Sequence, residues 1–234
     1  SESLKEFAIE HKFCKLIKIS VIENGTINGI DFKSQFNPRN IISTNFELEK
    51  LSENKFVIGF VGRLLNDKGI EDYLFTVSKC KEKNLPVVGF VIGPDESRGK
   101  LNTLLEKYNL IQDEDICLFG QQFEPEKFMI HFDILLLPTK REGFGLVGAE
   151  ANALKIPVVG YDIPGFRDAV LNKQTGMLVD FENRDKLLEA VLFYFNNPLL
   201  KKEHGGNGRK RVVRDFDQKL IWESFYHEYE KCLR

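Results

Sequence analysis

Short apolar runs recur along the chain, and within them apolar residues are consecutive instead of alternating with polar ones. They occupy residues 56–62, 87–93, 116–119, 133–137, 158–160 and 176–179. Runs of this kind are typical of strands buried on both faces, as in a parallel sheet. Between them, apolar positions recur with helical spacing over residues 70–83, 101–108, 126–132 and 146–154. This alternation predicts a doubly wound, Rossmann-like α/β fold with a parallel sheet.

The two ends of the chain depart from that alternation. Residues 4–14 predict a helix and residues 17–22 a further strand. The segment 24–31 is rich in asparagine and glycine, which suit sharp turns with positive φ. Extra C-terminal helices are predicted over residues 186–196, 199–213 and 218–233. We therefore expect the remainder of a preceding domain (1–23), a hinge loop (24–31), an α/β domain (32–216) and a C-terminal helix (217–234).

Composition restricts the class of protein. The chain has 33 basic and 35 acidic residues, a balance that argues against non-specific nucleic-acid binding. No apolar run approaches the ~20 residues of a membrane span. The cysteines form no CxxC pair, which disfavours a zinc site and suits core thiols in a reducing cytoplasm; they are Cys14, Cys80, Cys117 and Cys232. The chain opens directly into a helix, which is typical of a fragment of a longer protein.

The most informative segment is Glu142-Gly143-Phe144-Gly145-Leu146-Val147-Gly148-Ala149-Glu150, which follows a buried strand and opens a helix. In an open α/β sheet, ligands bind at the carboxyl ends of the strands. Small residues let a ligand approach the backbone, and the free amides at the start of a helix attract phosphate. The segment therefore predicts an anion-binding loop.

Two carboxylates flank this loop. Glu150 shares a helical stripe with apolar Val147 and Leu154, so it is expected to face the interior or a cleft. A buried carboxylate needs hydrogen bonds, which ribose hydroxyls would supply; an internal salt bridge or a protein amide is the alternative. Glu142 lies where amides would hold a phosphate, so it is expected to face sugar hydroxyls or developing positive charge. A solvated loop acid is the alternative for Glu142.

A second candidate segment, Gly62-Arg63-Leu64-Leu65-Asn66-Asp67-Lys68-Gly69, follows the first strong strand. Arg63 offers a planar fork and Lys68 a point charge, and both suit a diphosphate. Gly62 would permit close approach of a ligand to the backbone. The spacing is not that of a P-loop, and basic residues after a strand are also common as plain surface charges. Together with the loop at residues 142–150, Arg63 and Lys68 form a predicted diphosphate-binding site.

These segments resemble those of family-4 retaining glycosyltransferases of the GT-B type. The resemblance is carried by Arg63 and Lys68 in GR-x4-KG, by Glu142 and Glu150 in E-x7-E, and by the turn Asn28-Gly29-Ile30-Asp31. It continues through IPVV (156–159), PGFRDAV (164–170) and TGMLV (175–179), in order and spacing. The segments NGTINGID and PGFRDAV are similar to those of bacterial capsule, O-antigen and N-glycan sugar transferases, many of which use UDP-linked N-acetylhexosamines.

The resemblance implies a role for each matching position. Arg63 and Lys68 would neutralise the donor diphosphate, and Glu150 would hold the ribose. Glu142 would hold the donor sugar and phosphate together with the amides of Gly143, Phe144, Gly145 and Leu146. Phe119 and Gly120 would border the base. Asp168 stands where many relatives carry glutamate.

The resemblance also implies an activity and its requirements. Residues 32–216 would be the nucleotide-sugar-binding half of the enzyme, and residues 1–23 the end of an acceptor domain. The enzyme would transfer a hexose or N-acetylhexosamine from a UDP-linked donor to a lipid-linked or saccharide acceptor in surface polysaccharide synthesis, with retention, without a metal or cofactor. It would act in the cytoplasm, on the inner face of the membrane, and this chain alone would be inactive.

Several alternatives remain open at this stage. A UDP-sugar epimerase or an isolated nucleotide-sugar-binding module would share the fold, whereas a Rossmann oxidoreductase would need a G-x-G-x-x-G loop that the early strands lack. Asp113-Glu114-Asp115 has the DxD form of metal-dependent transferases, but it precedes a strand and is interpreted as a turn. The basic run Arg209-Lys210-Arg211, with Arg214, is interpreted as a solvated helix face or a contact with anionic lipid.

Overall fold

The computed structural model describes residues 1–26, 28–41 and 46–233, and in it a single parallel sheet forms the centre of the fold. The strand order is β3-β2-β1-β4-β5-β6, that of a doubly wound Rossmann-like sheet. All six predicted core strands are confirmed, each within one residue at its ends. They are β1 (Phe56–Val61), β2 (Val87–Ile92), β3 (Ile116–Leu118), β4 (Ile134–Leu137), β5 (Val158–Tyr161) and β6 (Gly176–Val179).

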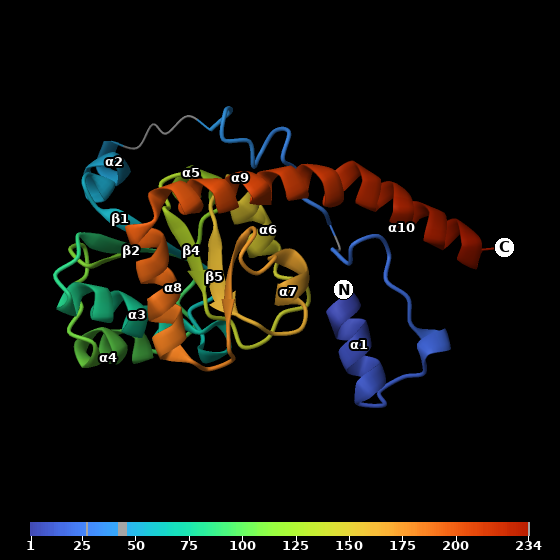
Figure 1. The fold of residues 1–234 in the computed structure, drawn as a ribbon, viewed down its shortest axis with the longest axis horizontal. Helices are drawn as coiled ribbons and strands as arrows, with labels where there is room; N and C mark the ends of the chain where they lie inside the picture. Colours follow the sequence, from blue (N-terminus) through green and yellow to red (C-terminus); the bar gives the residue numbers. More distant parts are fainter. Residues whose placement is uncertain (27, 42–45, 234) are drawn as a thin grey trace.

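Helices cover both faces of the sheet (Figure 1). On one face, α3 (Ile70–Glu82) packs against α8 (Arg184–Asn196), with α4 (Lys100–Lys107) beside α3. On the other face, α6 (Leu146–Ala153) packs against α9 (Pro198–Asp215), with α7 (Phe166–Ala169) beside α6. The short α5 (Glu126–Met129) precedes β4. Burial of the strands on both faces explains why their sequences are continuously apolar.

The core contains the side chains that the apolar runs predicted. Residues of β1, β2, β4 and β5 are almost entirely buried, together with the inner stripe of α3. Cys80 and Cys117 are buried among them, and burial raises the pKa of their thiols to about 12 and about 11. Both are therefore core thiols, as predicted. Leu192, Phe193 and Phe195 of α8 are partly buried and pack against the same core.

The strand predicted at residues 17–22 is wrong. Residues Leu16–Lys18 form a short 3-10 helix, η1, and the Ile17 side chain is 90% exposed. The alternating pattern there would suit a strand, but a strand needs a neighbour to satisfy its backbone groups, and no described strand pairs with this segment. The first helix, α1, spans Glu2–Glu10, and the sequence did not reveal α2 (Phe46–Ser52) or α7.

The basic run of α9 agrees only in part with the solvated helix face expected of it. Arg209 and Arg211 turn inward, and their guanidinium groups donate hydrogen bonds to backbone carbonyls. Such bonds satisfy carbonyls at the ends of α6 and α7 and in the turns at residues 32–36, so Arg209 and Arg211 anchor α9. Lys210 and Arg214 are exposed, as expected of a solvated helix face. The acceptors are Phe32, Phe36 and Ala153 for Arg209, and Asp168 and Ala169 for Arg211.

Two distant segments meet at one end of the sheet domain. The amide of Ile30 donates to the carbonyl of Phe216 at 2.8 Å, just before α10 (Gln218–Cys232) begins. α10 then projects away from the sheet, on the side where α1 also lies (Figure 1). Residue 27, within the predicted hinge loop, lies outside the described residues. No helix in the described part of the chain is both long and apolar enough to span a bilayer.

The contact between α6 and α9 depends on glycine. A Cβ added at Gly205 would lie 2.0 Å from the carbonyl oxygen of Lys155, just beyond α6, whereas one added at Gly206 would meet nothing within 4 Å. The same helix therefore offers a crowded glycine and an open one in adjacent positions.

We predict opposite effects of alanine at these two positions. Gly205→Ala should lower the free energy of unfolding by about 1–3 kcal/mol, because a backbone carbonyl cannot yield to the added methyl group. Gly206→Ala should raise it by about 0.5–1 kcal/mol, because alanine restricts the unfolded chain. Urea unfolding of the two variants beside the parent chain measures both effects. Equal responses would show that α9 does not approach α6 as closely as described.

Candidate functional site

A cavity of about 580 Å³ opens at the carboxyl ends of β1 and β4, between which the strand order reverses. This is where ligands bind in open α/β sheets, because the helices that follow the two strands leave toward opposite faces. Val61 of β1 and Leu137 of β4 form its floor. Eight of the residues predicted for the site line it: Gly62, Arg63, Lys68, Glu142, Gly143, Phe144, Gly145 and Leu146.

Lys68 and Glu142 form an ion pair across this cavity. Nζ of Lys68 lies 2.7 Å from Oε1 of Glu142, and the side chains are only 22% and 15% exposed. Partial burial makes such a pair stronger than a surface salt bridge. The two residues were predicted for neighbouring roles at one site, and the structure brings them into direct contact.

The backbone holds the two loops that carry this pair close together. Lys68 ends the 3-10 helix η2 (Asn66–Lys68), and Gly69 follows with φ +76°. A Cβ on Gly69 would lie 1.9 Å from the carbonyl oxygen of Pro138, so only glycine fits there. Next to this contact, the amide of Lys140 donates to the carbonyl of Asp67 at 2.8 Å. The distance between Lys68 and Glu142 is therefore set by close backbone packing.

Arg63 lies at the rim of the cavity. Its Nη1 is 3.2 Å from Oε2 of Glu96, and the two side chains are 51% and 44% exposed. An exposed ion pair contributes little free energy, so exchanging Glu96 for another anion costs little. Arg63 is therefore free to exchange its partner at the cavity, and its contact with a ligand stays a prediction.

The loop before α6 supplies backbone to the cavity. The ring of Phe144 is buried edge-to-face against Phe216 at 5.1 Å, so this residue anchors the loop instead of offering a free side chain. Gly143 has open space where a side chain would be. α6 begins at Leu146, and the first amides of a helix lack intrahelical acceptors. The loop and helix end therefore present donors of the kind that suit an anion, and anion binding here stays a prediction.

Glu150 is partly buried on α6. Burial, with the neighbouring Glu126 carboxylate, raises the pKa of Glu150 to about 7. Within the described residues its side chain forms no hydrogen bond or ion pair, so the alternative of an internal salt bridge has no support. Glu126, at the start of α5, is buried and accepts a hydrogen bond from Gln35 at 3.2 Å. The sequence did not single out Glu126, because only the fold brings it near α6.

Phe119 and Gly120 lie apart from the other predicted residues. They follow β3, the outermost strand, and do not line the cavity at β1 and β4. The Phe119 ring packs edge-on against Phe90 at 5.1 Å, and Gly120 accepts a hydrogen bond from the amide of Gly93 at 2.8 Å. Their contact with a nucleotide base stays a prediction.

Asp168 has a partner that the sequence did not reveal. Its Oδ2 accepts hydrogen bonds from the hydroxyl of Ser3 at 2.6 Å and from the Ser3 amide at 3.1 Å. The same hydroxyl accepts from the amide of Gly165 at 2.7 Å. Gly165 packs so closely on the Glu142 loop that a Cβ would lie 2.3 Å from the Glu142 carbonyl oxygen. Asp168 thus fastens α1 to a loop that braces the site.

The acidic run at residues 113–115 is a turn before β3, as predicted. Oδ2 of Asp115 lies 2.6 Å from Nζ of Lys81 and accepts from the amide of Ile111 at 2.8 Å. The run therefore lies at the amino end of its strand, away from the cavity. Within the residues that the structure describes, no group of acidic, histidine or cysteine side chains has a metal-binding arrangement.

Comparison with known sequences decides the family. The profile of the family described as glycosyl transferases group 1 matches residues 42–211, which is most of the chain. The chain belongs to the group 1 glycosyl transferases. It is 33% identical to CapM, a capsular polysaccharide biosynthesis glycosyltransferase of Staphylococcus aureus, over 100% of this chain and 61% of the relative. The chain thus spans about three fifths of the length of this curated relative.

Solved structures confirm the fold of this glycosyl transferase chain. A glycosyltransferase from Rickettsia africae superimposes with a TM-score of 0.83 at 23% identity, over 100% of this chain and 62% of that chain. HepE of Anabaena, crystallised in complex with UDP and glucose, gives a TM-score of 0.75 at 19% identity, over 87% of this chain and 56% of that chain. The expected architecture, a Rossmann-like half of a GT-B fold with extra C-terminal helices, is therefore confirmed.

The raised pKa of Glu150 predicts a pH-dependent stability for this glycosyl transferase chain. The folded protein holds the Glu150 proton more tightly than the unfolded chain, so ionisation opposes folding. This unfavourable contribution is absent below the ordinary value of 4.5, grows as pH rises, and is complete above about 7. Glu150→Gln should therefore raise the free energy of unfolding at pH 8 by on the order of 1–3 kcal/mol, with little change at pH 5.

Urea unfolding at both pH values measures the effect. Glu106→Gln, at an exposed position of α4, is the matched control and should change neither value. A stabilisation by Glu150→Gln that is equal at pH 5 and pH 8 would contradict the assignment.

Proposed function

We propose that this chain is the donor-binding half of a retaining glycosyltransferase that uses a UDP-linked sugar. It would transfer a hexose or N-acetylhexosamine to a lipid-linked or saccharide acceptor in surface polysaccharide synthesis. The observation that carries the proposal is the convergence of Lys68, Glu142 and Arg63 on one cavity at the switch point, beside the first turn of α6.

The charges in the cavity match those of the reaction. Breaking the anomeric C–O bond leaves negative charge on the departing diphosphate and positive charge on the sugar. Lys68, Arg63 and the amides at the start of α6 would stabilise the diphosphate, with the larger effect in the transition state. In this proposal these groups neutralise the leaving group without a metal, and no further cofactor takes part.

The Lys68–Glu142 pair would be shared with the donor. An ammonium group can donate more than one hydrogen bond, so Lys68 could bind a phosphate oxygen while it keeps Glu142 in place. Held in this way, Glu142 would accept hydrogen bonds from the hydroxyls of the transferred sugar and lie near its developing positive charge. A carboxylate beside a phosphate would normally be repelled by it. Here the positive charge of Lys68 would lie between the two anions and offset that repulsion.

In this proposal Glu150 would bind the ribose that follows the diphosphate. It is four residues beyond Leu146 along α6, about 6 Å at the rise of an α-helix. That separation suits a nucleotide whose diphosphate is held at the helix start. The 2′- and 3′-hydroxyls of the ribose would supply the hydrogen bonds that its carboxylate lacks among the described residues.

The acceptor would be held by a second domain. Ile30 and the start of α10 lie side by side, joined by the bridge between Ile30 and Asp217. The two connections between the domains would therefore share one hinge. α1 and residues up to 23 would be the end of that domain. α10 exposes Trp222, Tyr226 and Tyr229, which share one face of the helix by four-and-three spacing, an apolar surface of the kind that a neighbouring domain covers.

The relatives support this assignment in general terms. CapM is named for capsular polysaccharide biosynthesis, and HepE was crystallised with UDP and glucose. A UDP-sugar epimerase or a pure binding module would use the same cavity, and turnover assays separate them from a transferase. A nicotinamide dinucleotide would need a G-x-G-x-x-G phosphate-binding loop, which the early strands lack.

We predict that UDP raises the melting temperature of the chain and that NAD does not. A ligand stabilises the state that binds it, by mass action. Lys68→Met should weaken UDP binding roughly ten- to a hundredfold, because a charge-assisted bond to phosphate is lost. Lys79→Met, which removes an exposed lysine paired with Glu82, is the control and should leave the affinity unchanged. Stabilisation by NAD with no response to UDP would favour an oxidoreductase.

We further predict that this chain binds UDP-sugar but transfers no sugar. Transfer requires donor and acceptor to be held together in a cleft from which water is excluded. The assay compares the chain with a version extended upstream by a full α/β domain, using one UDP-sugar and a lipid-linked saccharide. Turnover by the short chain at a rate near that of the long one would contradict the proposal that a second domain must hold the acceptor.

A further inference from the structure

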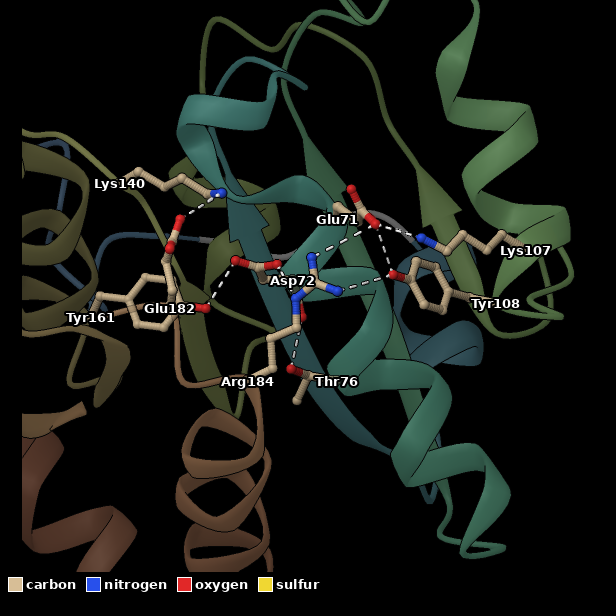
Figure 2. A network of polar contacts seen from close by, with 9 residues as sticks. All are labelled: Glu71, Asp72, Thr76, Lys107, Tyr108, Lys140, Tyr161, Glu182 and Arg184. Atoms are coloured by element: carbon tan, nitrogen blue, oxygen red, sulfur yellow. Dashed lines mark hydrogen bonds and ion pairs between the residues drawn. The ribbon is translucent and has the colours of Figure 1, made fainter. Parts of the chain in front are cut away.

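A network of polar contacts, drawn in Figure 2, contains none of the residues that line the cavity. It joins the first turn of α3, the start of α8, the end of α4 and the end of β5. Its central pair is Asp72 and Arg184: Nε of Arg184 lies 2.5 Å from Oδ1 of Asp72. The hydroxyl of Tyr161 donates to the other carboxylate oxygen at 2.9 Å. Nothing in the proposed donor chemistry uses these residues directly.

The central carboxylate is deeply buried. The side chain of Asp72 is 3% exposed, whereas that of Arg184 is 37% exposed and reaches it from the domain surface. A buried carboxylate is costly unless charged and polar partners compensate it. Arg184 also extends to Glu71 and to the Tyr108 hydroxyl, and Lys107 lies 2.7 Å from Glu71. The start of α3 is therefore fixed by groups from three other elements.

This fixation bears directly on Lys68. Asp72 is in the first turn of α3, and α3 begins at Ile70, immediately after Lys68 and Gly69. The amide of Tyr73 donates to the carbonyl of Gly69 at 3.0 Å, so a backbone hydrogen bond ties the first turn of α3 to the loop that carries Lys68. A shift of the first turn of α3 would move Lys68 with it.

The same segment also reaches the loop that carries Glu142. Oε1 of Glu182, two residues before Arg184, lies 3.3 Å from Nζ of Lys140, two residues before Glu142. Figure 2 shows both connections leaving the start of α8, one toward Asp72 and one toward Lys140. The ring of Phe181 packs edge-to-face on Tyr161 at 5.7 Å. One short segment, residues 181–184, therefore contacts the supports of both members of the Lys68–Glu142 pair.

We propose that Arg184 is a positioning residue for the donor site. Acting through Asp72, and beside Glu182, it holds Lys68 and Glu142 at the separation at which both engage a nucleotide diphosphate-sugar. The inference rests on the proposed function, since it assigns Arg184 a part in binding at that cavity. A purely structural ion pair would stabilise the fold without favouring the ligand.

The experiment measures UDP affinity and melting temperature together for the full chain. Arg184→Met should weaken UDP binding roughly three- to thirtyfold, the range of effects transmitted through a connected network. The matched control is Lys81→Met, which breaks the Lys81–Asp115 pair at the opposite end of α3. Those side chains are 33% and 13% exposed, so the control removes an ion pair of similar burial. Lys81→Met should lower the melting temperature and change UDP affinity less than twofold.

Two further variants separate positioning from loss of stability. Arg184→Lys keeps the charge but not the fork, and should recover part of the affinity. In combination with Lys68→Met, Arg184→Met should have little further effect on UDP binding, because the group that it positions is gone. If Arg184→Met alone does not fold, Arg184→Met/Asp72→Asn removes the uncompensated buried charge and should show the same loss of affinity.

The outcomes distinguish the two proposals. Absence of UDP binding by the parent chain, or binding unaffected by Lys68→Met, would overturn the proposed function and this inference with it. Binding that Lys68→Met weakens but Arg184→Met leaves within twofold would overturn the positioning role alone. Equal losses in Arg184→Met and Lys81→Met, or full additivity with Lys68→Met, would likewise reduce Arg184 to a structural residue.

Discussion

The contact between Gly69 and the carbonyl of Pro138 is the constraint on which the site depends. It joins the loop after β1 to the loop after β4 at the one place where the strand order reverses. Because the following helices, α3 and α6, leave toward opposite faces, these loops face each other across an open cavity. Any side chain at position 69 would separate them, and Lys68 would then be withdrawn from Glu142.

The two cations at the cavity, Lys68 and Arg63, differ in burial and therefore in how firmly each is held. Lys68 is held by a shielded carboxylate, so its position is defined before any ligand arrives. Arg63 is paired at the exposed rim with Glu96, and that pairing is weak enough to be exchanged. In the proposed function these two cations would complement each other: the fixed ammonium would define the position of the diphosphate, and the exchangeable guanidinium would move to meet its phosphates.

Local patterns in the sequence predicted much of this arrangement, and non-local contacts explain the rest. The six strands and the loops at 62–69 and 142–150 could be predicted because consecutive apolar residues and glycine-rich turns act over a few positions. The partner of Asp168 could not, because Ser3 lies 165 residues away. The hydrogen bond from Arg209 to the carbonyl of Phe36 joins residues 173 positions apart, so it could not be predicted from local patterns either. The false strand at 17–22 is the converse case, a local pattern without a partner among the described strands.

The contacts of Ser3 have a mechanical consequence for Glu142. The Ser3 hydroxyl bridges Asp168 and the amide of Gly165, and Gly165 lies against the backbone of Glu142. The hydroxyl of Ser1 also donates to the carbonyl of Gly143 at 3.4 Å. A displacement of α1 would therefore have to break one hydrogen bond that ends on the glycine-rich loop itself and others that end on Gly165 and Asp168 beside it. Glu142 is thus restrained from two directions, by Lys68 on the side of α3 and by the loop that α1 holds. A carboxylate restrained in this way has little freedom to reorient, so the proposed orientation of Glu142 toward the donor sugar would be set by the fold before a ligand is bound.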